Sequence, residues 1–256
     1  MKPRGPGGYH PRMDLELDNL RVQNGFRLRG ESVSRLETFV DAAFAFAVTM
    51  MVISVGALPQ SVAELMQALH RVPTFVACFG ILMLFWASHN RWSRRYGLET
   101  SGTTLLSLSF VLVVLIWLYP LRMVIAGAFT LITGGWVPSE MQASTASDLQ
   151  DCFLIYGAGF AALCLILLQL HRLALAAADE LRLDALERLE TRRELGSHGI
   201  LLGFAAVSIA MTFFLREQRS WIVSLPGFLY SGIGPAMHFH HARFHRLRKA
   251  LPPRAG

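Results

Sequence analysis

The chain alternates long apolar runs with short polar connections, and six apolar runs stand out. They cover about residues 34–57, 73–92, 103–132, 151–169, 198–215 and 220–239. A helix needs about 20 consecutive apolar residues to cross the hydrocarbon core of a bilayer. The pattern therefore predicts an all-α membrane protein with six transmembrane helices. The third run is too long for an upright span, and its Pro120 predicts a kink.

The composition supports a membrane protein. Hydrophobic residues make up 53% of the chain and charged residues only 16%, whereas soluble domains carry about 25% charged residues. The first 34 residues are polar and rich in arginine, without the apolar segment of a cleavable signal peptide, so the first span should act as the insertion signal. The cysteines lie in or beside apolar runs without a CxxC pair, which favours packing over disulfides or zinc: Cys78, Cys152 and Cys164.

The basic residues predict the orientation. They are concentrated in the N-terminal segment, the second and fourth connections and the tail. The first connection has only Arg71, the third has none, and the fifth is a short turn with two arginines. The positive-inside rule then places both termini in the cytoplasm. Only two of the 24 basic residues are lysines, a bias that we attribute to a GC-rich bacterial genome, so the expected location is a bacterial inner membrane.

Three regions are expected along the chain. Residues 1–33 form a partly flexible cytoplasmic segment, 34–240 the six-helix domain, and 241–256 a basic cytoplasmic tail. Residues 174–196 are rich in alanine, leucine, glutamate and arginine, with leucines at helical spacing. This pattern predicts that the fourth helix continues into the cytoplasm as an amphipathic extension.

The first apolar run contains ionisable residues near its cytoplasmic start, Glu37 and Asp41. Asp41 lies about two turns into the run, where an acidic group is costly and usually paired and functional, although it could also be hydrated at the interface. Arg35 is six positions away, on another face of the helix, and cannot pair with Asp41 directly. The second span ends at the same depth with His89 and Asn90. We therefore expect a network of Arg35, Asp41, His89 and Asn90.

Two stripes follow the first helix. One is apolar: Phe39, Phe46, Met50 and Ile53. The other consists mainly of small residues: Ala42, Ala45, Thr49, Val52 and Gly56. Such stripes are most often packing surfaces, because small residues let membrane helices approach closely. An apolar ring can also gate a pore by dewetting, and a threonine hydroxyl can contact a passing ion.

The pattern Arg35-x-x-x-Phe39-x-Asp41 resembles the RxxxFSD signature at the start of the first helix in the endosomal/lysosomal potassium channel family, transmembrane protein 175 and its prokaryotic homologues. Trp86-x-x-His89 looks like the WxxH of that family's second helix. The prokaryotic members have six spans in one chain, which matches the predicted count. The resemblance covers roughly residues 34–240, and its specific motifs lie in the first two helices.

The resemblance implies a homotetrameric cation channel in the lipid bilayer, with the first helix of each subunit lining a central pore and potassium as the permeant ion. Carried over by position, the pore constriction and the threonine layer would be formed by Phe46, Thr49, Met50 and Ile53. The residues that would hold the inner helix ends together are Arg35, Phe39, Asp41, Trp86, His89 and Asn90.

Two positions depart from the family pattern. Val40 stands where the signature has serine, which removes one hydroxyl from the network. Phe46 stands where isoleucine or leucine is usual. A ring of phenylalanines around the pore axis could close the pore more firmly or change its selectivity.

Other functions find less support in the sequence. It contains no GxSxG, HExxH or P-loop motif, so we expect no enzyme and no cofactor. The arginines lie in connections between apolar helices, a pattern that sets topology, so we expect no nucleic-acid partner. The tail residues His238, His241 and His245 share a helical face and could bind a metal, but a basic tail at the anionic inner leaflet is the favoured interpretation. The alternative functions are a secondary transporter with an intramembrane acidic site and a non-conducting membrane scaffold of the same fold.

Overall fold

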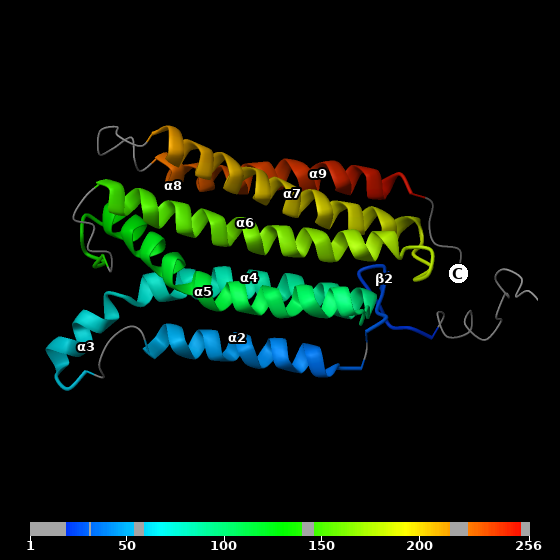
Figure 1. The fold of residues 1–256 in the computed structure, drawn as a ribbon, viewed down its shortest axis with the longest axis horizontal. Coiled ribbons are helices and arrows are strands. Elements are labelled where there is room, and N and C mark those ends of the chain that lie inside the picture. Colours follow the sequence, from blue (N-terminus) through cyan, green and yellow to red (C-terminus); the bar gives the residue numbers. More distant parts are fainter. Residues whose placement is uncertain (1–18, 31, 54–58, 140–145, 216–224, 252–256) are drawn as a thin grey trace, which may run out of the picture.

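The fold is an antiparallel bundle of long helices, seen in a computed structural model that describes residues 19–30, 32–53, 59–139, 146–215 and 225–251. The elements are β1 (Val22–Gln23), β2 (Phe26–Arg27), α2 (Arg35–Ile53), α3 (Val62–Leu69), α4 (Val72–Tyr96), α5 (Ser101–Ile132), α6 (Ala146–Ala176), α7 (Ala185–Phe214), α8 (Leu225–Leu229), the 3-10 turn η2 (Tyr230–Gly232) and α9 (Ile233–Lys249). In Figure 1, α2 lies at one edge of the bundle, followed by α4 with α5, then α6 and α7, with α9 at the opposite edge.

Among the residues that the structure describes, five helices are long and apolar enough to cross a membrane, namely α2, α4, α5, α6 and α7. Each of the first five apolar runs falls on one of these helices, but α6 extends beyond its run at both ends and α7 begins at Ala185, well before residue 198. The predicted sixth run begins in residues outside the described part. Its described residues form α8, η2 and α9, which pack against α7, and α9 continues through the basic tail to Lys249. The 3-10 turn η2, which ends at Gly232, separates α8 from α9, whereas Pro226 lies within α8 and Gly234 and Pro235 lie in the first turn of α9, where proline is tolerated.

The helix α5 keeps its full predicted length. Thr100 caps its start through a reciprocal capping box with Thr103. The helix continues through Pro120 to Ile132, so the proline does not end it. Tryptophan N–H groups link α4 and α5 to α6, because Trp92 donates to the Leu170 carbonyl and Trp117 to the Tyr156 carbonyl. The three cysteines are buried as free thiols, which agrees with a packing role.

The prediction of one helical extension over residues 174–196 was wrong. The helix α6 ends at Ala176, and a turn with a left-handed residue, Arg182 at φ 49°, follows it. The next helix then begins at Asp184, whose carboxylate accepts from the Glu187 N–H at 2.8 Å while the Glu187 side chain accepts from the Asp184 N–H at 3.1 Å. This capping box starts a new helix instead of continuing the old one. The predicted extension is therefore divided between the end of α6 and the start of α7.

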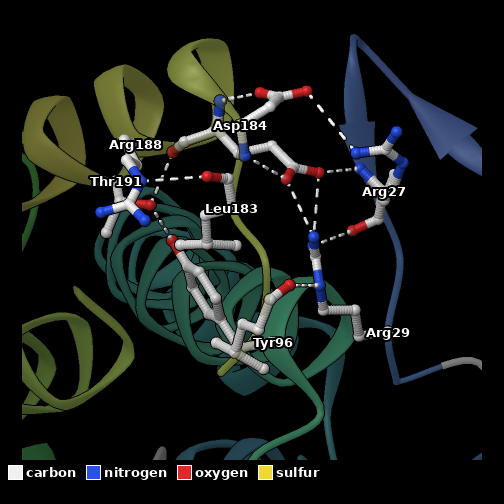
Figure 2. A network of polar contacts seen from close by, with 9 residues as sticks. Arg27, Arg29, Tyr96, Leu183, Asp184, Arg188 and Thr191 are labelled. Atoms are coloured by element: carbon white, nitrogen blue, oxygen red, sulfur yellow. Dashed lines mark hydrogen bonds and ion pairs between the residues drawn. The ribbon is translucent and has the colours of Figure 1, made fainter. Parts of the chain in front are cut away.

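The described part of the N-terminal segment is docked against α7. A two-stranded hairpin turns at Asn24 and Gly25, both of which have positive φ as a tight hairpin turn requires. Arg29 forms a 2.9 Å ion pair with Glu187, in which the two side chains are 8% and 0% exposed. The Arg27 N–H donates to the same carboxylate at 2.8 Å. Figure 2 shows Arg27 and Arg29 beside Asp184 at the start of α7. The expected flexibility at the very start of the chain falls on residues 1–18, outside the described part.

One further element was not predicted. The connection after α2 contains the short helix α3, which is capped by Ser61 accepting from the Glu64 N–H at 3.2 Å. It lies apart from the main bundle, at the end opposite the hairpin (Figure 1).

Candidate functional site

The helix α2 has one covered face and one uncovered face. The face that packs against α4 and α5 carries the buried residues Glu37, Val40, Phe44, Ala47 and Met51. The opposite face is exposed along the whole helix and carries Arg35, Thr38, Phe39, Ala42, Ala45, Phe46, Thr49, Val52 and Ile53. Both sets recur at spacings of three and four residues, as expected for two sides of a helix. The position of α2 at the edge of the bundle leaves this second face open (Figure 1).

Three of the four predicted constriction residues lie on the uncovered face. Phe46 is 56% exposed and Ile53 is 63% exposed. Thr49 is also exposed, and its hydroxyl donates to the Ala45 carbonyl at 2.9 Å within the helix. Met50 is half-buried and packs against the core, so it lies at the border between the two faces. Within one subunit, nothing in the described part of the chain covers the face that carries Phe46, Thr49 and Ile53.

The acidic residues of α2 meet α4 in two rungs. The Trp86 indole N–H donates to the Asp41 carboxylate at 2.7 Å. One turn nearer the helix start, the Asn90 amide donates to the Glu37 carboxylate at 3.3 Å, and Arg94 lies 3.6 Å from the same oxygen. The two acidic residues are four positions apart on α2, and Trp86 and Asn90 are four positions apart on α4. Because the two helices run antiparallel, both contacts therefore lie on the sides of α2 and α4 that face each other.

This pairing corrects the predicted network. Asn90 reaches Glu37 instead of Asp41. His89 turns toward α5, where its Nε2 lies 2.9 Å from the Ser107 hydroxyl and its ring stacks on Phe110 at 5.3 Å. His89 lies three residues after Trp86, only about 60° around the helix, yet its ring contacts α5 instead of α2. His89 supports α2 only indirectly, because the ring of Phe110, on which His89 stacks, contacts Phe44 of α2.

Two signature residues stay outside these contacts. Arg35 and Phe39 lie on the uncovered face, and Phe39 is 53% exposed. Arg35 makes no ion pair with any other residue that the structure describes. Val40, which replaces the serine of the signature, is buried in the apolar core. Within one subunit, the signature thus divides into residues that bind α4 and residues that point away from it.

The far end of α2 is held by a buried cation. Arg122 of α5 is 7% exposed, and its guanidinium donates to the Met51 carbonyl at 3.3 Å. The last carbonyls of a helix lack partners within the helix, so a donor from a neighbouring helix stabilises them. Polar contacts from α4 and α5 therefore fasten α2 at both ends.

The sequence reasoning missed some members of this site. Glu37 was noted only as ionisable, and Arg94 and Ser107 were not singled out. Glu37 and Asp41 are four residues apart, as are Trp86 and Asn90, so helical spacing alone could have suggested the two rungs.

The histidine-rich tail packs on α7. His240 lies 2.9 Å from the Arg193 carbonyl, and His241 lies 3.4 Å from the Ser197 hydroxyl. A surface pocket of about 470 Å³ is lined by Glu190, Arg193, His238, His241, Ala242, Phe244, His245 and Arg248. Over the residues described, the three histidines of the shared face do not converge on a metal-binding geometry.

Known proteins resemble this chain over most of its length. The family model of the endosomal/lysosomal potassium channel TMEM175 matches residues 35–120, from the start of α2 to the middle of α5. A protein of Marivirga tractuosa named "Potassium channel" is 26% identical over 217 residues, which cover 83% of this chain and 87% of that protein.

Two crystal structures share the fold. A variant of the potassium channel MtTMEM175 matches with a TM-score of 0.75 at 24% identity, over 88% of this chain and 99% of that chain. A lysosomal potassium-selective channel TMEM175 homolog from Chamaesiphon minutus matches with a TM-score of 0.51 at 17% identity, over 82% and 96%. These matches confirm the resemblance that the Arg35-x-x-x-Phe39-x-Asp41 pattern indicated, to the endosomal/lysosomal potassium channel family TMEM175.

Proposed function

We propose that the protein is a passive potassium channel in which the uncovered face of α2 lines a central pore. The observation that carries this proposal is the exposure of one largely apolar face along the full length of α2, which is less buried in the bundle than α4, α5 and α6 and as little buried as α7. A helix that is fastened at both ends and bare on one side is suited to line a conduit formed by several subunits. The Marivirga relative named for potassium conduction supports the choice of ion.

The proposed assembly is a homotetramer. In the described part of one subunit, α2 lies at the edge of the bundle (Figure 1), so its exposed face would need further copies of the chain to form the wall of a conduit. Closed rotational symmetry would bring the α2 faces of several copies together around one axis. Arg35 and Phe39, which are exposed on the uncovered face of α2, would then face the neighbouring subunits at the pore entrance.

The proposed topology has six spans with both termini in the cytoplasm. The segment α8–η2–α9 runs back along α7 and would complete the sixth crossing. Figure 1 shows the hairpin and the end of α9 at the same end of the bundle, which supports an even number of crossings. Arginine-rich connections gather at this end, and the positive-inside rule would place it in the cytoplasm of a bacterial cell.

Within the pore, Phe46 and Ile53 would form apolar constrictions and Thr49 would offer its hydroxyl to a passing ion. Met50 would border the constriction from the packed side of the helix. Apolar rings gate by excluding water, so the size of the side chain at Phe46 should control the leak.

A flux assay on the purified protein in liposomes tests this function. Wild-type protein should carry potassium down its gradient without another energy source, and Phe46→Ala should raise the flux or relax its selectivity. The matched control is Phe213→Ala on α7, because Phe213 is 58% exposed and Phe46 is 56% exposed. Absence of cation flux under several ionic conditions would refute the channel. Equal flux from Phe46→Ala and wild type would remove Phe46 from the pore.

A further inference from the structure

A buried group of metal-binding side chains lies between α6 and α7, away from the uncovered face of α2. It consists of His171 of α6 and Glu194 and His198 of α7, and one ligand atom from each lies within 4.8 Å of the others. His171 is 2% exposed and His198 is 5% exposed. In the part of the chain that the structure describes, this is the one group of three such side chains that converge in this way.

The two imidazoles are arranged as metal ligands usually are. The Nδ1 of His171 lies 2.8 Å from the Leu167 carbonyl, which can only accept, so Nδ1 carries the proton and Nε2 keeps its lone pair. A histidine that donates one ring N–H to a carbonyl is oriented to bind a metal through the other nitrogen. The hydrogen bond within α6 therefore fixes the tautomer of His171 that a metal requires.

His198 has an unused nitrogen. Its Nε2 lies 3.3 Å from the Ser88 hydroxyl of α4, whereas its Nδ1 is buried without a hydrogen-bond partner. A buried polar atom without a partner costs free energy, and a bound ion would remove that cost. With the Nε2 proton directed at Ser88, the lone pair of Nδ1 is free to bind a cation.

Glu194 supplies the negative charge. Its Oε1 accepts from Arg95 at 3.4 Å and from Arg193 at 3.1 Å, so both ion pairs use the same oxygen. The other oxygen can serve as a ligand. The positive charges of the two guanidinium groups repel a bound cation. The site therefore disfavours ions that bind by charge attraction alone. Calcium and magnesium further require six or more oxygen ligands, whereas two imidazoles with one carboxylate suit zinc and its neighbours.

We propose that His171, Glu194 and His198 bind a divalent transition-metal ion of the zinc class, with water as the fourth ligand. Three protein ligands with one open position are a recurrent zinc arrangement. Donor atoms around tetrahedral zinc lie roughly 3.3 Å apart, so the side chains need only small rotations to close on the ion. The metal would join α6 to α7 and, through Ser88, to α4. This proposal is independent of conduction.

Cobalt absorption tests the site directly. The full chain, purified with a tag other than polyhistidine and stripped of metal, should bind one Co²⁺ per subunit with visible bands of tetrahedral coordination, and Zn²⁺ should displace it. His171→Asn keeps an N–H that can donate to the Leu167 carbonyl, and His198→Gln keeps an amide that can hydrogen-bond to the Ser88 hydroxyl. Each should weaken Co²⁺ binding by more than roughly 100-fold, because it removes a ligand directly.

The matched control removes the other histidine cluster. A variant that combines His238→Ala, His241→Ala and His245→Ala should bind Co²⁺ like the wild type. Absence of binding by the wild type would overturn the proposal, as would loss of binding in the tail variant with retention in His171→Asn and His198→Gln. If these two variants do not fold, zinc-edge X-ray absorption of the wild type decides. Two imidazoles are expected, and a spectrum with none or with three would refute the site.

Discussion

The contact between Trp86 and Asp41 should be the strongest single polar link between α2 and α4. Trp86→Phe removes the indole N–H and keeps an aromatic ring in place. The lost bond is 2.7 Å long and ends on a carboxylate. Hydrogen bonds to charged groups contribute about 1.5–3 kcal/mol to stability. Both side chains are half-buried, so water competes for them and we expect a value in the lower half, about 1.5–2 kcal/mol.

A double-mutant cycle isolates this value from the loss of ring volume. Trp86→Phe, Asp41→Ala and the double variant would be compared by their unfolding free energies in mixed micelles. The expected coupling energy is about 1.5–2 kcal/mol. Side-chain hydrogen bonds between membrane helices average about 0.6 kcal/mol in such cycles. A coupling at or below this value would refute the contact between Trp86 and Asp41 as a strong polar link between α2 and α4.

Trp92→Phe serves as the matched control for the substitution itself. Its indole N–H donates at 2.9 Å to the backbone carbonyl of Leu170, a neutral acceptor. Both variants lose the same ring volume, and Trp92 is the more buried residue. The loss of unfolding free energy in Trp92→Phe should therefore come mainly from lost packing, with a small contribution from the lost hydrogen bond. Conduction should change in Trp86→Phe but not in Trp92→Phe, because only the former loosens α2.

Further predictions concern the ends of the helices. Glu187→Gln should cost about 3–5 kcal/mol and speed hydrogen exchange over residues 19–30, because buried Arg29 loses its counter-ion; unchanged exchange would argue against docking of the hairpin. Its control, Arg188→Met, should cost only about 1 kcal/mol, because it removes an ion pair to Asp179, which is 96% exposed, and one hydrogen bond to the Leu183 carbonyl. Arg122→Met should speed exchange in the last turn of α2 and lower stability by about 1.5–3 kcal/mol; protection equal to wild type would show that this contact does not fasten the helix.

The positions of the helices were largely predictable from hydropathy. In a bilayer every backbone group must be bonded within the segment, so long apolar runs such as those of α4 and α7 become helices. The junction after α6 was not predicted, because the leucine spacing continues across it. Its signal was the capping box of Asp184 and Glu187, which is local and easily overlooked within an amphipathic pattern.

Side-chain pairings could be predicted only in part. The depth of Asp41 and its need for a partner followed from the sequence, but the identity of the partner depends on the rotation of α4 about its axis. A small rotation of α4 about its axis decides whether Trp86 or His89 reaches the Asp41 carboxylate. The group of His171, Glu194 and His198 shows the same limit. Glu194 and His198 are neighbours on one helix, whereas His171 joins them only after α6 and α7 have packed.

The central claim is that the uncovered face of α2 meets water and ions. Cysteine substitution in the reconstituted protein tests it most directly, because the native cysteines Cys78, Cys152 and Cys164 are buried. A charged, water-soluble thiol reagent should block potassium flux through Phe46→Cys and Thr49→Cys. It should leave Phe213→Cys unaffected. Flux that is untouched in Phe46→Cys and Thr49→Cys, with the reagent active against other sites, would show that this face of α2 packs against lipid or protein and does not line the pore.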